Sequence, residues 1–206
     1  MDQKRVELIN KVKARIDEIT DQLAPLVDVG VEDNNPIDTI INTLLDESAV
    51  EVLLKAPFVR LDITSDSTAV AVSNSAIPAT GTIQLPESFL RLVSLRFDDW
   101  HKSVTELAIK GDAVSARQGN KHLRAGKARP VGVLTRNSEG PVIEYYSSDS
   151  HEIAELLYIE RKSAEQLTNM QTIEAMCWIC AARVLQVVGR NDAASNAYNN
   201  AQSLLM

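Results

Sequence analysis

The chain has 206 residues, a formal net charge of −7, 45% apolar residues, 24% charged residues and only 4% aromatic residues. This length and composition allow a sizeable core and exclude wholesale disorder, and aliphatic side chains must supply most of the buried area. The acidic balance argues against a general DNA-coating protein, because such proteins are basic overall.

Two helices are predicted at the start of the chain. From about residue 3 to 24, aliphatic residues recur at spacings of three and four among charged residues, which is the period of an amphipathic helix. Pro25 is expected to end it. A second helix is expected to begin at Asn35 and Pro36, where Asn caps the helix and Pro occupies its first turn, and to stop at Pro57.

The middle of the chain, residues 58–160, predicts short strands. The segments RLDI, STAVAVS, GTIQLP, FLRLVSLRF, PVGVLTR, GPVIEYYS and IAELLYIE are rich in β-branched or aromatic residues and partly alternate. The Asn-Ser-Glu-Gly sequence at 137–140 predicts a hairpin between two of them. The polar stretch at 110–130 predicts one short helix and a long loop, and loops of that length are usually functional or mobile.

Two more helices are predicted at the end of the chain. Residues 170–190, MQTIEAMCWICAARVLQVVGR, are apolar nearly all round the helix, which predicts the central helix of the core, with Gly189 as its stop. Asn191 and Asp192 are predicted to cap a last helix. One face of that helix carries mostly small residues, namely Ala194, Ala197, Tyr198, Ala201 and Leu205.

This order of elements predicts an α+β fold without internal repeats. Residues 1–57 and 161–206 are expected to form a discontinuous helical bundle. Residues 58–160 are expected to form a central β-rich insertion that carries the basic helix-loop at 110–130.

Cys177 and Cys180 form a CxxC motif, which occurs in redox proteins and zinc sites. A redox pair lies at a helix N-terminus, where the helix dipole lowers the thiol pKa, whereas these cysteines fall inside a predicted helix on its buried face. A zinc site needs a second pair or nearby histidines, and His101, His122 and His151 are scattered without ligand spacing. We therefore predict inert core cysteines, no metal and no other cofactor.

The sequence also lacks recognisable catalytic motifs. It contains no GxSxG elbow, phosphate-binding glycine loop, GxGxxG or HExxH. Asp98, Asp99, Trp100 and His101 could in principle serve catalysis or bind a metal. The favoured interpretation is a polar turn after FLRLVSLRF, with Trp100 anchored on the core. We therefore expect no catalytic residues and no enzymatic activity.

One basic segment stands out in this acidic chain. Residues 91–136 hold ten Lys or Arg and four Asp or Glu, whereas the remainder holds eleven basic and twenty-four acidic residues. Such a segment suits contact with phosphates or with an acidic protein, and a merely solvated loop is the alternative. No recognised motif predicts sequence-specific readout. The candidate DNA-backbone or partner contacts are Arg117, Lys121, Arg124, Lys127 and Arg129.

The N-terminus and the cysteine content bear on location. The first twenty residues alternate charged and apolar side chains, whereas a secretory signal needs an uninterrupted apolar run. No run approaches the roughly 18 apolar residues of a membrane helix. Two cysteines cannot form a disulfide framework. The chain is therefore expected inside a cell or in a particle assembled there, without membrane contact.

The order of these features resembles head-to-tail connector proteins of short-tailed bacteriophages, including ring proteins of crAss-like phages. The resemblance covers residues 36–205 best. It is carried by the helix that opens with Pro36, by LPESFLRLVSLRFDDW, by the basic KGDAVSARQGNKHLRAGKARPVGVL, by the hairpin, by IAELLYIERK and by the two C-terminal helices.

The resemblance implies a virion protein, assembled in the host cytoplasm, that forms a dodecameric ring between the portal protein and tail components. Genome DNA would pass through that ring non-specifically, and the basic segment would face DNA or a neighbouring subunit. The small-residue face of the last helix would contact the portal or another subunit. Two alternatives stay open: a monomeric accessory nucleic-acid-binding protein that uses residues 117–136, and a CxxC redox protein.

Overall fold

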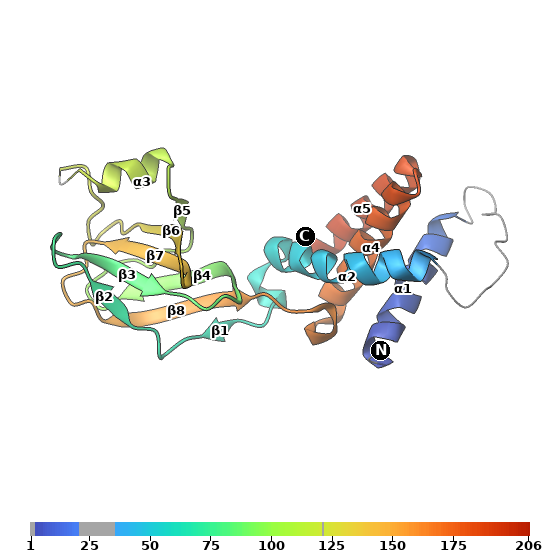
Figure 1. Ribbon diagram of the computed structural model, residues 1–206, viewed down its shortest axis with the longest axis horizontal. Coiled ribbons are helices and arrows are strands. Elements are labelled where there is room, and N and C mark those ends of the chain that lie inside the picture. The colour runs from blue at the N-terminus through green and yellow to red at the C-terminus, as the bar shows by residue number, and fades with distance from the viewer. Residues whose placement is uncertain (1–2, 21–35, 121) are drawn as a thin grey trace. The chain divides into compact units, whose positions relative to one another are not determined.

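The computed structural model describes residues 3–20, 36–120 and 122–206 (Figure 1). The fold class is α+β, as predicted, with N- and C-terminal helices flanking a β-rich region. The chain divides into two compact units. The helical unit comprises residues 1–62 and 161–206, and the β unit comprises residues 63–160.

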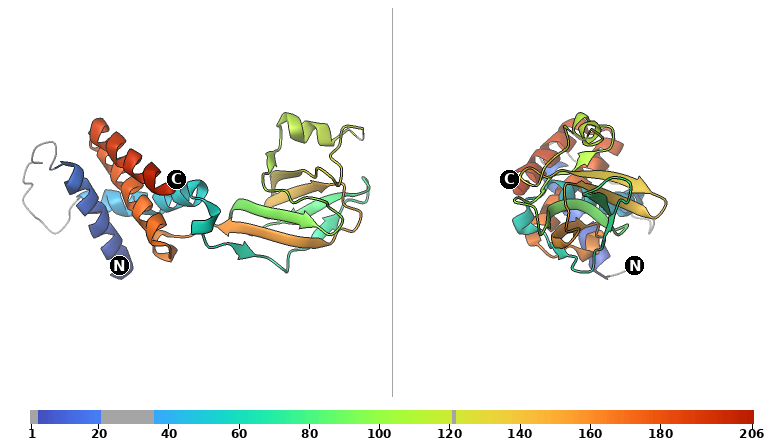
Figure 2. Two further views of the ribbon diagram at one scale, coloured as in Figure 1. Left: turned by 180° about the vertical axis from the view of Figure 1, so that it is seen from behind. Right: turned by 90° about the vertical axis from the view of Figure 1, so that its left-hand side faces the viewer.

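The described part of the helical unit consists of four helices and two short 3-10 turns. They are α1 (Gln3–Thr20), α2 (Pro36–Lys55), η1 (Phe58–Arg60), η2 (Ala164–Gln166), α4 (Met170–Val187) and α5 (Asn191–Leu205). Helices α1, α2 and α5 all pack against α4 (Figure 2). Residues 175–182 of α4 are buried without a break, which explains why apolar side chains surround this helix.

Local hydrogen bonds set the ends of α4. The side chain of Asn169 accepts hydrogen bonds from the N–H groups of the second and third helical residues, as an N-cap does. At the other end Gly189 has a φ of +79°, and Gly189 and Arg190 donate to carbonyl groups of the last turn in a Schellman pattern. Arg190 precedes α5 without a side-chain cap. The prediction that Asn191 and Asp192 cap that helix is therefore wrong.

Three other helix-end predictions concern the first half of the chain. Helix α2 ends two residues before Pro57, as predicted. The predicted end of the first helix at Pro25 and the predicted cap at Asn35 both lie outside the described residues.

Residues 58–62 belong with the helices rather than with the strands. The guanidinium of Arg60 donates to the carbonyl oxygen of Leu204 in α5. Asp62 pairs with Lys162 at 2.8 Å and accepts a hydrogen bond from the hydroxyl of Thr168 at 3.0 Å. The segment RLDI is therefore not a strand, and the helical unit extends to residue 62 instead of 57.

The β unit contains two sheets. Its elements are β1 (Thr64–Ser65), β2 (Ala71–Ser73), β3 (Thr80–Gln84), β4 (Phe89–Phe97), β5 (Ala108–Ile109), α3 (Ala113–Gln118), β6 (Gly132–Asn137), β7 (Gly140–Tyr146) and β8 (Ile153–Glu160). The strand orders are β1-β8-β4 and β2-β3-β7-β6-β5, and every pairing is antiparallel except β5 with β6. The two-residue strand β5 is absent from the sequence prediction.

The hairpin between β6 and β7 forms where the sequence predicts it. Asn137 pairs with Gly140 across the turn, and the side-chain oxygen of Asn137 accepts the N–H of Glu139 at 2.8 Å. Gly140 has a φ of +130°, a conformation that favours glycine.

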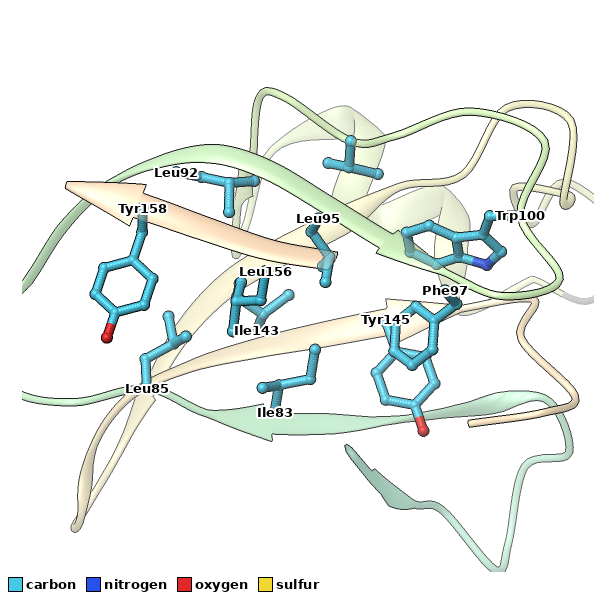
Figure 3. Close-up of a cluster of buried hydrophobic side chains, with 11 residues drawn as sticks. Ile83, Leu85, Leu92, Leu95, Phe97, Trp100, Ile143, Tyr145, Leu156 and Tyr158 are labelled. Atoms are coloured by element: carbon cyan, nitrogen blue, oxygen red, sulfur yellow. The ribbon is translucent and has the colours of Figure 1, made fainter. Parts of the chain in front are cut away.

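The core of the β unit lies between its two sheets (Figure 3). It is formed by Ile83, Leu85, Leu92, Leu95, Phe97, Trp100, Val104, Ile143, Tyr145, Leu156 and Tyr158. The ring of Phe97 lies 4.4 Å from that of Tyr145 and 4.8 Å from that of Trp100, centroid to centroid. Gly81 is required beside this cluster, because a Cβ there would lie 2.3 Å from the hydroxyl of Tyr145.

Candidate functional site

The basic helix-loop at 110–130 folds around one buried polar side chain, that of Gln118 at the end of α3. Its Nε2 donates to the carbonyl of Val114 at 2.9 Å, and its Oε1 accepts the N–H of Ala125 at 2.9 Å. The backbone carbonyl oxygen of Gln118 also accepts a hydrogen bond from Nε of Arg124 at 3.1 Å. The chain after α3 is therefore held back against the helix, which the polar composition of the segment does not predict.

The five candidate basic residues have different environments. Lys127 pairs with Asp99 at 3.0 Å and with Asp149 at 2.7 Å. Arg124 is half-buried and held by the loop. Arg117 and Arg129 are exposed, and neither side chain has a hydrogen-bond or ion-pair partner within the described part of the chain. Lys121 lies outside the described residues.

Two further cations of the basic segment are paired with carboxylates of the β unit. Lys110 pairs with Glu144 of β7 at 2.8 Å. Arg136 pairs with Glu87 at 2.8 Å. Part of the positive charge in this segment is thus paired with carboxylates inside the β unit. Among the five candidates, Arg117 and Arg129 are the most available for an external partner.

Asp99 links the basic loop to the turn after β7. Its carboxylate accepts hydrogen bonds from the hydroxyl of Ser148 at 2.9 Å and from the N–H of Asp149 at 2.8 Å, in addition to its pairing with Lys127. Partial burial raises the pKa of Asp99, but these donors outweigh it and lower the pKa to about 2. Asp99 therefore stays ionised and bridges two segments.

The surrounding residues adopt the predicted turn. The N–H of Trp100 donates to the carbonyl of Phe97 at 3.0 Å, and the indole is buried against the Phe97 ring. His101 is exposed, and its backbone N–H donates to the carbonyl of Lys127. Within the described residues, no group of three or more His, Cys, Asp or Glu side chains is arranged to hold a metal ion.

The CxxC cysteines lie inside α4, as predicted. Both are fully buried, and the Sγ of Cys180 lies 3.8 Å from the carbonyl oxygen of Ile41 in α2. Burial raises the pKa of each thiol to about 12. A thiol with that pKa is almost entirely protonated at neutral pH, and the thiolate is the reactive form.

The small-residue face of α5 packs inward. Ala194, Ala197 and Ala201 are buried in the helical unit, so the chain itself covers them, which corrects the prediction that they contact another chain. Tyr198 donates to Glu51 of α2 at 2.7 Å, with the Lys55 ammonium over its ring. Leu205 is half-buried.

A cavity of about 530 Å³ opens beside α2 in the helical unit. Its lining includes Asp46, which pairs with Arg5 at 3.2 Å, and Glu47, which pairs with Arg183 at 3.0 Å. Ser163, also in the lining, precedes η2, and its N–H donates to Gln166. These lining groups hold the helices together, and none of them forms a catalytic pair of a nucleophile with a general base.

Six exposed apolar side chains of the β unit are absent from the candidates predicted from the sequence. Val70, Val72 and Ile77 lie on and next to β2, and Ile109, Val114 and Leu123 lie on and around β5 and α3. The alternation in STAVAVS places Val70 and Val72 on one face, which is a signal for the first group. The second group has no comparable pattern.

Comparison with known proteins identifies no family. No protein-family model matches the chain, and no curated protein matches it significantly. Among the described residues, no helix is both long and apolar enough to cross a membrane.

Proposed function

We propose that this chain is a structural subunit of a bacteriophage head-to-tail connector, a ring of copies that docks between the portal protein and the tail and forms part of the DNA conduit. The proposal starts from the resemblance of residues 36–205 to connector proteins of short-tailed phages. The observation that carries it is the placement of exposed apolar side chains in two separate groups on the β unit.

Two separate contact surfaces are what a ring subunit needs. Each copy in a closed ring meets one neighbour through one surface and the other neighbour through a different surface. Large apolar side chains that stay exposed in a group commonly mark a protein interface.

The helical unit supports the proposal as a stiff scaffold. Arg5 bridges Asp46 and Glu165, at 3.2 and 2.5 Å, and thereby ties α1 to α2 and η2. Arg183 of α4 pairs with Glu51 of α2 at 2.7 Å. These ion pairs join α1, α2 and η2 to one another and α2 to the buried central helix α4, which suits a structural part that keeps its shape.

The charges of the β unit support passage of DNA rather than tight capture. Arg117 and Arg129 offer positive charge to a phosphate backbone or to a neighbouring subunit, whereas the chain as a whole carries −7. Non-specific DNA affinity grows with the number of cations that contact phosphates. A few available cations on an acidic subunit suit a conduit, through which DNA must slide.

The two alternatives are less well supported. A redox protein needs an accessible thiolate, and burial raises the pKa of Cys177 and Cys180 to about 12. A monomeric nucleic-acid-binding protein that holds DNA with residues 117–136 needs many free cations there, and Lys127 and Arg136 are engaged by carboxylates.

Particle imaging tests the proposal. The purified chain, mixed with portal proteins of short-tailed and crAss-like phages, is expected to add a closed ring of copies to the portal. A chain that associates with no virion component, or that turns over a substrate through its paired thiols, would contradict the proposal. Salt-dependent DNA binding by the isolated monomer, lost in the Arg117→Ala and Arg129→Ala double variant, would favour the accessory nucleic-acid-binding alternative.

A further inference from the structure

One edge of the five-stranded sheet is apolar and uncovered. Strand β2 is outermost in that sheet and pairs only with β3 within the described residues. Val70 and Val72 are 70% and 62% exposed, and Ile77, just beyond the strand, is exposed as well. Proteins usually protect such an edge with charged residues, above all Lys, and residues 63–90 contain neither Lys nor Arg.

A hollow beside this edge can receive a side chain. It has a volume of about 330 Å³, and its lining combines Val72 and Ile77 at the edge with polar groups, among them Thr82, Glu144 and Tyr146 on the neighbouring strands. A side chain from another molecule would therefore find recessed surface there, apolar at Val72 and Ile77 and polar at Glu144.

The opposite edge of the same sheet is formed by β5, with α3 beside it (Figure 1). Ile109 and Leu123 are 64% and 61% exposed, and Val114 on α3 is also exposed. The N–H of Ile109 donates to the side chain of Asp112 at 3.1 Å, so this part of the edge is closed to strand pairing. A partner would therefore contact this edge through its side chains and not through backbone pairing. Arg117, three residues after Val114, adds an exposed positive charge.

The two edges differ in charge as well as in shape. Of the two acidic side chains in residues 63–90, Glu87 pairs with Arg136, whereas Asp66, four residues before Val70, has no ion-pair partner within the described residues. At the α3 edge Lys110 and Lys127 are paired with carboxylates, and Arg117 is exposed without an ion-pair partner in the described part of the chain. Apart from Ile63, every large apolar side chain that is exposed in the described β unit belongs to one edge or the other. The charges without an ion pair next to the two edges, Asp66 and Arg117, are thus opposite in sign, and each edge presents exposed apolar side chains.

We propose that a second copy of this chain covers these edges, with the β2 edge of one copy (Val70, Val72 and Ile77) packed against the α3 edge of the next (Ile109, Val114, Leu123 and Arg117). The inference rests on the proposed function and names the contact by which the ring closes. A heterologous contact satisfies both edges on every copy, whereas pairing of two β2 edges gives a dimer and leaves the α3 edge exposed. The opposite charges favour unlike edges over like ones.

Disulfide cross-linking tests the contact. The native cysteines are buried, so thiols introduced by Val72→Cys and Val114→Cys are the accessible ones. Under mild oxidation at rising protein concentration, the double variant is expected to give a ladder of dimers, trimers and larger species, and each single variant is expected to stay monomeric. The control is Ile63→Cys with Val114→Cys, because Ile63 is exposed in the same unit and lies on neither edge.

The expected rate for the edge pair is at least roughly tenfold that of the control pair, the ratio that a contact of about 1.4 kcal/mol produces. Equal rates, or no ladder at any concentration or on the portal, would overturn the proposal. Dimers formed by the Val72→Cys single variant would replace it with a symmetric contact between β2 edges.

The ring and its interface can fail separately. If rings form on the portal and the edge pair does not cross-link within them, this interface is wrong and the connector function stands. If the ladder forms and no portal is bound, the interface stands and the connector function is wrong.

Discussion

The Asp99→Asn substitution should loosen the β unit. Asp99 joins two segments, because it accepts hydrogen bonds from the turn after β7 and pairs with Lys127 of the basic loop. Asparagine keeps the size of the side chain, removes its charge and replaces one acceptor oxygen with a donor. Asp98→Asn is the matched control, because Asp98 is the adjacent residue and its side chain is exposed.

The magnitude follows from the pKa. The pKa of Asp99 falls from 3.8 to about 2 in the folded chain, which corresponds to at most about 2.4 kcal/mol of stabilisation by the carboxylate. Screening by solvent at this partly exposed site reduces the expected value to about 1–2 kcal/mol. Because the folded pKa is the lower one, the stabilisation is present above pH 3.8 and is lost as the pH falls towards 2.

Urea unfolding followed by tryptophan fluorescence measures this effect. The chain has two tryptophans, so a Trp178→Phe background leaves Trp100, inside the β unit, as the reporter. At neutral pH the Asp99 variant should lose about 1–2 kcal/mol and the Asp98 variant less than about 0.5 kcal/mol. The difference between the parent and the Asp99 variant should shrink as the pH approaches 2. Equal losses in the two variants, or a difference that persists at pH 2, would refute the reasoning.

Three other predictions concern the cores. Cys177 and Cys180 should not react with an aromatic disulfide reagent until the chain is unfolded, and fast reaction in the native state would refute their burial. Asn169→Ala should destabilise the helical unit by about 1 kcal/mol in urea unfolding, and no loss would mean that the cap is dispensable. Gly81→Ala should destabilise the β unit by about 1–3 kcal/mol, because its Cβ would overlap a buried tyrosine hydroxyl. Gly126→Ala, with open space around it, is the control, and equal losses would contradict the packing.

The fold was predictable wherever the signal is local. Helical periodicity and the alternation in FLRLVSLRF and IAELLYIE indicate α2, α4, β4 and β8 directly, because burial of one face imposes the period. The segment RLDI has the same local pattern, yet Arg60 and Asp62 bond to Leu204 and Lys162, which are distant in sequence. The strand β5 forms through its pairing with β6, and a segment of two residues carries no local pattern from which that pairing could be predicted.

The candidate site was predictable in composition and not in environment. The sequence reveals a basic segment, but the partners of Lys127 come from two other turns of the β unit, so the neutralisation appears only in the fold. The alanines of α5 form a close-packing face in either case, and the sequence does not say whether that face packs on its own chain or on another. Burial in the helical unit decides the question.

The pairing of β1 with β8 bears on how the chain reaches its fold. Thr64 lies opposite Tyr158, so the folded β unit brings the two ends of its roughly 100 residues together. Without that pairing, α2 could meet α4 only by closing the loop of about 115 residues between Lys55 and Met170. Counting the pairing as a shortcut leaves an effective loop of about 20 residues, which lowers the entropic cost by about 1.5 kcal/mol. The β1–β8 pairing therefore holds the two ends of the insertion together. Once it has formed, α2 can pack against α4 at a lower entropic cost.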